Sequence, residues 1–441
     1  MVDEGNGDGI ARRQFLGSAA AGAFGTAAAA GASGTTAADP GDEHYHNPVG
    51  PVGFGDVTAV QAEDGTYYAY GTETPLDVVP IARSENLVDW TYVTAAFDSS
   101  PEWRDDPDAG VWAPDVNYVD GEYRLYYSYS TWGSQNNPGI GLATADSPTG
   151  PFTDRGPVFR GEDLGMTNAI DADLVVEDGT PYLIWGSFFG IYGVRLTPDG
   201  SDYVPGTTFH VAGDNREGPT VVRENGYYYL FLSTGQCCEG ADSTYEVEVG
   251  RAESLTGPYY APDGRDLREI DEHHAGATVL TGTDQFIGPG HNGAIRDEAG
   301  NWWMLYHVEA TADREDRVMM LDRIRFDDDD GWPVVGCDGT PCTESPRPVM
   351  DPESTPRDDQ TPTTPEDQGP PAIGGGAAPT DPDGDGLYED LNGNGEVDYS
   401  DVVSYFETMD DPAMTDNVAA YDYNGNGEVD FADLVDLFEQ V

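Results

Sequence analysis

The sequence predicts an all-β protein, a five-bladed β-propeller, followed by a small α-helical calcium-binding module. Three observations predict this architecture. A turn containing glycine and then an aromatic-rich strand recur five times between residues 63 and 308. Long helical periodicity is absent from the same region. Near the C-terminus, two near-identical acidic segments each precede a short apolar helical pattern. The length of 441 residues allows about two to four domains.

Residues 1–38 have the pattern of an export signal. Arg12 and Arg13 precede Phe15, Leu16 and an Ala/Gly-rich stretch, which resembles a twin-arginine signal peptide. We expect cleavage near Ala38, where small residues gather. The alternative is a chance arginine pair before a low-complexity stretch. No other segment has about 18 consecutive apolar residues, so no membrane span is predicted. The protein is therefore expected to be secreted by the twin-arginine route.

The charge of the chain is strongly negative. Asp and Glu number 82 and Lys and Arg number 20, so the formal net charge is −62 (20 − 82), and no lysine is present. Such a surface repels nucleic acid and anionic membranes, which excludes both as partners. Near-molar salt shortens the Debye length to about 3 Å and removes the self-repulsion. We therefore expect a salt-adapted protein of halophilic archaeal type; an acidic mesophilic secreted protein is the alternative.

Residues 44–350 carry the five repeats. In each repeat, an acidic or polar turn joins one strand to an aromatic-rich strand, as in a β-hairpin. The repeats are about 47–74 residues apart, a spacing that favours propeller blades. A β-sandwich is the alternative fold, but it explains five similar hairpins poorly. The turn glycines are Gly65, Gly121, Gly179, Gly226 and Gly300.

Four titratable residues occupy matching positions in four of the repeats. Asp56, Glu217 and His291 stand nine residues before their turn glycines, and Asp171 stands eight before its own. Trp112 takes this position in the second repeat. The first strand of each propeller blade lines the central channel, so we expect these side chains around one cavity. A single carboxylate would be a solvated loop residue by default, but four matching positions predict a site.

The chemistry of such a site suits the cleavage of glycosidic bonds. One carboxylic acid can protonate the leaving oxygen, while a second carboxylate activates water.

Five motifs together resemble glycoside hydrolase family 43, and more narrowly its extracellular endo-1,5-α-L-arabinanases. The resemblance covers roughly residues 45–350. The motifs are WAPDV (112–116), NAIDADL (168–174), GSFFGIY (186–192), CCEGADSTYEVEVGRAESLTGPY (237–259) and GPGHN (288–292).

The resemblance implies an inverting enzyme that acts on arabinan in the side chains of plant pectin. Asp56 then matches the general base and Glu217 the general acid, while Asp171 orients the proton donor and raises its pKa. His291 matches a histidine that faces a metal ion, usually Ca²⁺. The sequence departs from the family at two points, because Gly-Asp-Val replaces His-Asp-Pro around the base and Ala172 replaces a proline.

Residues in the same motifs are expected to bind the sugar: Trp112, Asn168, Ser187 and Phe188, with Phe189 as a further stacking candidate. Core packing is an equal alternative for the aromatic ones. Three other functions remain open. The first is an exo-acting α-L-arabinofuranosidase or β-xylosidase of the same family. The second is a non-catalytic glycan-binding propeller, and the third is a retaining β-fructosidase of the same architecture.

The four cysteines form two pairs. Cys337 and Cys342 are close enough in sequence to close a small disulfide loop outside the cell. Cys237 and Cys238 are adjacent and have no CxxC or HxxxH partner nearby. We therefore interpret them as buried packing residues rather than as a zinc site.

Residues 351–380 predict a flexible linker rich in Pro, Thr, Gly and acids. Residues 381–441 then hold two Ca²⁺ loops, each with oxygen ligands at EF-hand spacing and Gly395 or Gly427 at the sharp turn. One helix after each loop, and Asp at the last position, resemble a dockerin module. This implies a cohesin-like partner; a calcium-stabilised end cap or surface anchor is the alternative. The expected ligands are Asp390, Asn392, Asn394, Glu396, Asp398 and Asp401, and Asp422, Asn424, Asn426, Glu428, Asp430 and Asp433.

Overall fold

The computed structural model divides into two compact units, residues 1–355 and 356–441, and each is described by itself. In the first unit it describes residues 44–101, 103, 108–132, 137–269, 276–312, 314, 316–327 and 330–350. In the second unit it describes residues 373, 379–380, 387–392, 397, 399–409, 414, 417–421, 423, 429 and 431–440. The predicted signal peptide lies outside these residues, as does nearly all of the predicted linker.

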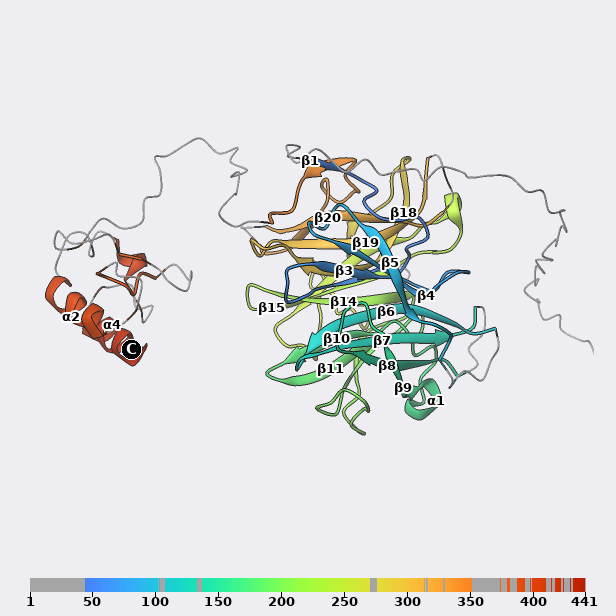
Figure 1. Ribbon diagram of the computed structural model, residues 1–441, viewed down its shortest axis with the longest axis horizontal. Coiled ribbons are helices and arrows are strands. Elements are labelled where there is room, and N and C mark those ends of the chain that lie inside the picture. Colours follow the sequence, from blue (N-terminus) through green and yellow to red (C-terminus); the bar gives the residue numbers. More distant parts are fainter. Residues whose placement is uncertain are drawn as a thin grey trace, which may run out of the picture. The chain divides into compact units, whose positions relative to one another are not determined.

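The described part of the first unit contains five four-stranded antiparallel sheets, each built from strands consecutive in sequence (Figure 1). The first two blades are β2 (Thr58–Gln61), β3 (Tyr67–Tyr70), β4 (Val78–Ser84) and β5 (Thr91–Phe97), then β6 (Gly110–Val119), β7 (Glu122–Ser130), β8 (Gly139–Ala145) and β9 (Thr153–Arg160). The third and fourth are β10 (Asp173–Glu177), β11 (Thr180–Trp185), β12 (Ile191–Arg195) and β13 (Phe209–Ala212), then β14 (Arg216–Glu224), β15 (Tyr227–Thr234), β16 (Glu246–Ala252) and β17 (Ala277–Leu280). The fifth is β18 (Phe286–Arg296), β19 (Trp302–Thr311), β20 (Val318–Phe326) and β21 (Pro333–Val335). Two single turns of helix, α1 (Gly161–Leu164) and η1 (Gly240–Asp242), lie in connections.

The predicted five-bladed propeller is confirmed, and the turn glycines explain its regularity. Each of the five lies between the first and second strands of its blade, with φ between 72° and 84°. A side chain is strained in this left-handed region, whereas glycine is not. The glycines thus fix the length of the first turn in every blade.

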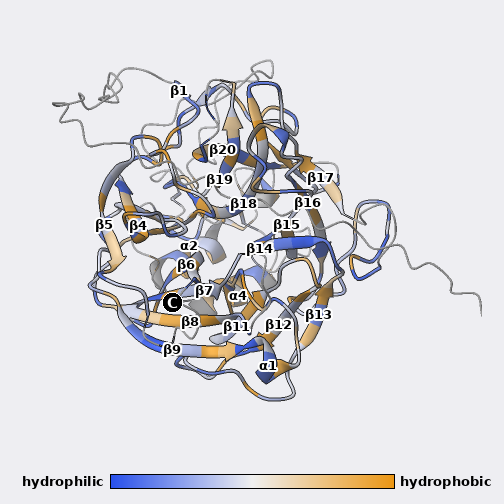
Figure 2. Ribbon diagram, turned by 90° about the vertical axis from the view of Figure 1, so that its right-hand side faces the viewer, coloured by the Kyte–Doolittle hydropathy of each residue, from blue (hydrophilic) through white to orange (hydrophobic). Residues whose placement is uncertain are grey.

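Apolar clusters fill the interfaces between neighbouring blades. Trp303 belongs to the cluster between the fifth and first blades, Tyr127 to that between the first and second, and Trp185 to the next. Leu230 and Tyr306 mark the remaining two interfaces. In Figure 2, β6 and β14 lie toward the centre of the ring, while β9 and β13 lie at its rim. The first strands are therefore the ones that face the axis.

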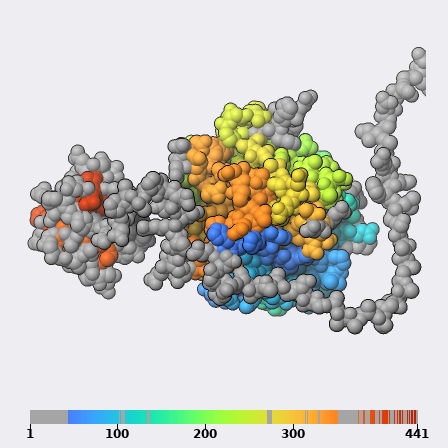
Figure 3. Space-filling view, turned by 90° about the horizontal axis from the view of Figure 1, so that it is seen from above, coloured from blue at the N-terminus to red at the C-terminus, as the bar shows by residue number. Residues whose placement is uncertain are grey.

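The two ends of the propeller sequence close the ring. The strand β1 (His44–His46) pairs antiparallel with β22 (Glu344–Pro346). Figure 3 accordingly shows N-terminal residues, in blue, against orange residues from the end of the propeller. The Asn47 amide donates hydrogen bonds to the carbonyls of Leu321 (2.8 Å) and Cys342 (3.0 Å). The predicted Cys337–Cys342 disulfide is present beside this contact.

The second unit contains the helices α2 (Tyr399–Thr408) and α4 (Phe431–Gln440) and the 3₁₀ turn η2 (Val418–Ala420). Tyr405 and Leu437, from the two longer helices, are completely buried in one apolar cluster. Its short helices agree with the predicted pattern, but its likeness to dockerin remains a prediction. Among the described residues of both units, no helix is long and apolar enough to cross a membrane.

Candidate active site

A cavity of about 850 Å³ lies at the centre of the propeller. Its walls include Asp56, Asp171, Glu217 and His291, the four residues that occupy matching positions in the sequence repeats. The predicted sugar-binding residues line it as well: Trp112, Asn168, Ser187, Phe188 and Phe189. The structure thus brings every predicted propeller site residue into one cavity, and it is large enough for an oligosaccharide segment.

The backbone turns sharply at the matching position, or one residue after it, in all five blades. The residues concerned share a positive φ: Asp56 (53°), Ala113 (41°), Asp171 (60°), Gly218 (55°) and His291 (46°). In β6, β14 and β18 the strand ladder shifts register around this point. Such bulges bend a strand and redirect its side chains, and strained non-glycine residues gather at functional sites. The turn explains how these side chains leave the sheet and enter the cavity.

Glu217 is held from both sides of its carboxylate. Ser187 Oγ donates to its Oε2 at 2.9 Å, and Tyr245 OH donates to its Oε1 at 2.6 Å. Asp171 lies beside it and accepts the Gly218 N–H at 3.3 Å. Burial, and then the charge of Glu217, raise the pKa of Asp171 well above its ordinary value. Asp171 therefore retains a proton beside Glu217.

Asp56 has the opposite environment. Arg317 Nη1 lies 3.3 Å from its Oδ2, His291 Nδ1 lies 3.4 Å from its Oδ1, and the Thr72 hydroxyl donates to Oδ2. Burial alone would raise the pKa of Asp56, but Arg317, His291, His307 and the Thr72 hydrogen bond outweigh burial and lower it. Asp56 is therefore ionised while Asp171 retains a proton, so the cavity contains one carboxylate and one protonated carboxyl group.

Asp56 also contacts a network of polar and charged side chains in which His307 and Glu309 are buried. The Asp56 N–H donates to His307 Nδ1 at 3.1 Å, so that nitrogen is unprotonated and Nε2 carries the proton toward Glu309, 3.1 Å away. Arg317 Nη2 lies 3.0 Å from the same Glu309 oxygen. Burial would raise the pKa of Glu309, but the hydrogen bond from His307 and the charge of Arg317 lower it to about 2. Glu309 thus fixes the two groups that contact Asp56.

Sequence reasoning missed several residues of the site, including Thr72, whose hydroxyl donates to Asp56. His307 and Glu309 alternate on one face of a buried aromatic strand, and that pair of polar residues was a usable signal. Arg317, Tyr245 and Trp132 gave no such signal. The Trp132 side chain is 72% exposed and lines the cavity, as does Phe189 at 42%. These exposed rings offer flat faces to a sugar.

A second cavity, of about 140 Å³, shares Asp56 and His291 with the first. The first strands of the blades line it with Thr58, Asp115, Asp173, Thr220 and Asn292. Neither side-chain polar atom of Asn292, which is 3% exposed, has a hydrogen-bond partner among the residues that the structure describes.

The charges around this second cavity suit a hydrated cation. Burial raises the pKa of Asp115 to about 7, and burial together with Asp115 raises the pKa of Asp173. Burial, the largest effect, lowers the pKa of His291, which keeps its imidazole neutral and able to bind a metal. The residues present therefore fit the metal ion that the family resemblance implies.

In the second unit, three predicted calcium ligands are completely buried: Asp390, Asp401 and Asp433. Asn392 donates its backbone N–H (3.1 Å) and its side-chain amide (2.6 Å) to Asp401 Oδ1. Carboxylates are almost never fully buried unless they are paired or bind metal. The other predicted ligands lie outside the described residues: Asn394, Glu396, Asp398, Asp422, Asn424, Asn426, Glu428 and Asp430.

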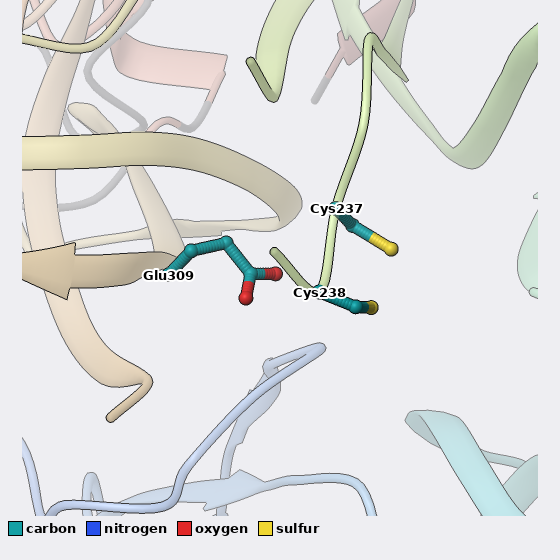
Figure 4. A group of neighbouring side chains, drawn as sticks. All are labelled: Cys237, Cys238 and Glu309. Atoms are coloured by element: carbon teal, nitrogen blue, oxygen red, sulfur yellow. The ribbon is translucent and has the colours of Figure 1, made fainter. Parts of the chain in front are cut away.

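The prediction that Cys237 and Cys238 are buried packing residues is wrong. Cys237 is half-buried, Cys238 is exposed, and both line the large cavity. Cys238 has φ of 67°, and both side chains leave the loop toward the same side (Figure 4). Adjacent cysteines look like core residues in sequence, but this loop is irregular and its backbone turns them outward.

Comparisons with known proteins agree with the geometry. The family model for glycosyl hydrolases family 43 matches residues 45–333. Extracellular endo-alpha-(1->5)-L-arabinanase 1 of Bacillus subtilis is 35% identical over 293 residues, covering 63% of this chain and 86% of the relative. An extracellular exo-alpha-(1->5)-L-arabinofuranosidase of Cellvibrio japonicus is 31% identical over 306 residues, covering 62% and 84%. An alpha-L-arabinanase structure from Cellvibrio cellulosa, complexed with arabinohexaose, has a TM-score of 0.59 at 29% identity and covers 64% of this chain and 95% of that chain.

Proposed function

The chain belongs to glycosyl hydrolase family 43, and from that premise we propose that it hydrolyses 1,5-α-L-arabinofuranosidic bonds within arabinan, with inversion at the anomeric carbon. It is a glycoside hydrolase. The observation that carries the proposal is the contrast between its carboxyl groups. Asp56 is held ionised by Arg317, whereas Asp171, beside Glu217, retains a proton.

In the proposed reaction each group has one task. Asp56 accepts a proton from the attacking water, and Glu217 delivers a proton to the departing sugar oxygen. The hydroxyls of Ser187 and Tyr245 keep the Glu217 carboxyl group in place. Asp171 keeps a proton available to Glu217. Trp112, Trp132 and Phe188 line the cavity where sugar rings would stack.

Calcium is part of the proposal at two places. In the propeller, His291, with Asp115 and Asp173 around the smaller cavity, would hold the ion directly or through water. Such an ion would supply a fixed positive charge close to Asp56. In the second unit, Asp390 and Asp401 of the first loop and Asp433 of the second loop would help to hold two more ions, which stabilise the fold of the tail.

An exo-acting arabinofuranosidase is the second candidate, because one relative carries that name. Product sizing on linear arabinan, debranched arabinan and xylan, in near-molar salt, separates the two modes of action. Endo cleavage yields mixed short arabinans before any monomer. Arabinose as the only product from the earliest time point would establish the exo mode, and release from xylan alone would overturn the arabinan assignment.

We also propose that the protein is secreted and works in high salt. Two relatives are named as extracellular, and Arg12 and Arg13 offer a twin-arginine signal for export. The net charge of −62 supports the salt dependence. Export that survives replacement of both arginines by lysine would contradict the route. Equal activity in dilute and near-molar salt would contradict the adaptation.

For the tail we propose a calcium-stabilised end cap or surface anchor, with a cohesin-like partner as the second use. Val403, Phe406 and Val435 on α2 and α4 are 41%, 59% and 43% exposed, which gives the helices an apolar outer surface. Failure of immobilised cohesin modules to retain the full chain in Ca²⁺ would exclude the second use.

A further inference from the structure

Two thiols that line the active-site cavity lie beside a buried carboxylate. Sulfur atoms of Cys237 and Cys238 and a carboxylate oxygen of Glu309 all lie within 4.8 Å of one another. The cysteines come from the loop after β15, whereas Glu309 comes from β19 in the next blade (Figure 4). Neither thiol is in a disulfide. Two thiolates with one carboxylate form a ligand set that borderline-soft divalent cations prefer.

A protein cation already interacts with two of these ligands. Arg317 Nη2 donates to Cys238 Sγ at 2.9 Å and lies 3.0 Å from Glu309 Oε1. Through Nη1 the same guanidinium reaches Asp56. A metal ion that takes the sulfur and the oxygen must replace both contacts of Nη2. It would thereby release Arg317 from the position in which it holds Asp56.

We propose that Cys237, Cys238 and Glu309 form an inhibitory site for one thiophilic divalent cation of the Zn²⁺ and Cd²⁺ class. The ion binds by displacing the thiol protons, and it lowers activity by separating Arg317 from Asp56 and by occupying the cavity wall. The binding half of the proposal is independent of the substrate. The inhibitory half rests on the proposed function, because it needs hydrolysis as a readout.

The experiment titrates the full chain with Cd²⁺ in excess Ca²⁺, which keeps the oxygen-ligand sites of the tail filled. The ultraviolet charge-transfer band of Cd²⁺–thiolate bonds reports only on sulfur ligation. We expect this band to saturate at one equivalent, and hydrolysis of arabinan to fall in parallel by about tenfold or more, as expected when a catalytic group is misplaced. Excess chelator followed by Ca²⁺ should restore activity.

Variants test whether Cys237, Cys238 and Glu309 produce the charge-transfer band. Cys237→Ser/Cys238→Ser should lose the band, and Cd²⁺ should no longer change its activity relative to its own metal-free rate. Glu309→Gln should keep the band but bind Cd²⁺ about 10-fold or more weakly. Circular dichroism checks that each variant is folded.

Three results would overturn the inference: no band with the native chain, saturation of the band without loss of hydrolysis, or equal inhibition of the double serine variant. Absence of the band would leave the arabinanase proposal intact. If arabinan is not cleaved at all, the band still tests the metal site by itself.

Discussion

At the residue scale, the two proposed catalytic roles depend on the different surroundings of chemically similar carboxyl groups. Arg317 and two histidines surround Asp56, whereas hydroxyl donors and Asp171 surround Glu217. A nitrophenolate leaving group departs without much protonation. Glu217→Ala should therefore lose about 10²–10⁴-fold on arabinan, the usual size of general-acid assistance, and far less on an aryl arabino-oligosaccharide. Asp56→Ala should lose similar factors on both substrates.

Asp171→Ala should follow the Glu217 pattern, because in the proposed reaction Asp171 acts through the proton that Glu217 delivers. Steady-state kinetics on the two substrates measure the contrast, and thermal melts must show that each variant is folded. An Asp56→Ala enzyme rescued by the better leaving group, together with equal loss on both substrates for Glu217→Ala, would reverse the two roles.

Arg317 provides a second test at this scale. Its charge lowers the pKa of Asp56, so removal of the charge should raise that pKa. A general base must be ionised, and the acidic limb of the kcat/KM profile should therefore move to higher pH in Arg317→Gln. The loss of position should also lower kcat by about 10²-fold. Arg317→Lys keeps the charge, so its acidic limb should lie closer to that of the native protein. An unmoved limb in Arg317→Gln would show that Arg317 does not control this ionisation.

At the element scale, β18 brings its backbone unusually close to a residue of the site. A Cβ atom added at Gly290 would lie 2.1 Å from ring atoms of Tyr245, the residue that holds Glu217. Gly290→Ala should push this ring away, cost about 1–3 kcal/mol of stability through overpacking, and lower kcat.

Gly121→Ala is the matched control for that substitution. Gly121 has φ of 84° and no atom within 4 Å of an added Cβ, so alanine there strains only a distant turn. It should cost about 1 kcal/mol of stability and leave the kinetics unchanged. Chemical denaturation and kinetics of both variants separate the two effects. Equal kinetics for Gly290→Ala and the native enzyme would mean that Tyr245 does not position Glu217.

At the scale of the whole molecule, closure of the ring introduces a pH dependence. Asp322 is completely buried where β20 meets the N-terminal segment, and burial raises its pKa from 3.8 to about 7. The folded state therefore binds a proton that the unfolded state releases. The resulting stabilisation is complete below about pH 4 and is lost as pH rises through about 7. Asp322→Asn has no such proton, so its melting temperature relative to the native protein should rise between pH 5 and pH 8, on the order of a few degrees. A constant difference would show that Asp322 does not titrate in this range.

Calcium removal tests the separate stability of the two units. Buried acidic side chains in the tail repel one another without a cation. The free energy of Ca²⁺ binding therefore contributes directly to the folding of the tail. In calorimetry of the full chain, EDTA should abolish or lower the transition of the tail, while the propeller remains folded and melts separately. A single transition that EDTA does not shift would contradict both the calcium loops and the independence of the units.

The sequence by itself determined the features that follow from local backbone rules. Glycine turns and alternating aromatic strands repeat within each blade, so their register revealed the number of blades and aligned Asp56, Asp171, Glu217 and His291. The tertiary structure decided the environments of these residues. Asp56 and Arg317 are 261 positions apart and meet only because the fifth blade closes against the first.

Contacts between segments distant in sequence explain what the sequence analysis missed or misread. His307 and Glu309 act on Asp56 across the junction of the fifth and first blades. Tyr245, the residue before β16, reaches Glu217 of β14 within the same blade. Cys237 and Cys238 are adjacent in sequence, yet the third member of their cluster comes from another blade. Short-range patterns specify where a chain turns and which face of a strand is buried. The pKa of a carboxyl group instead depends on every charge within a few ångströms, and in a closed ring those charges come from both ends of the chain.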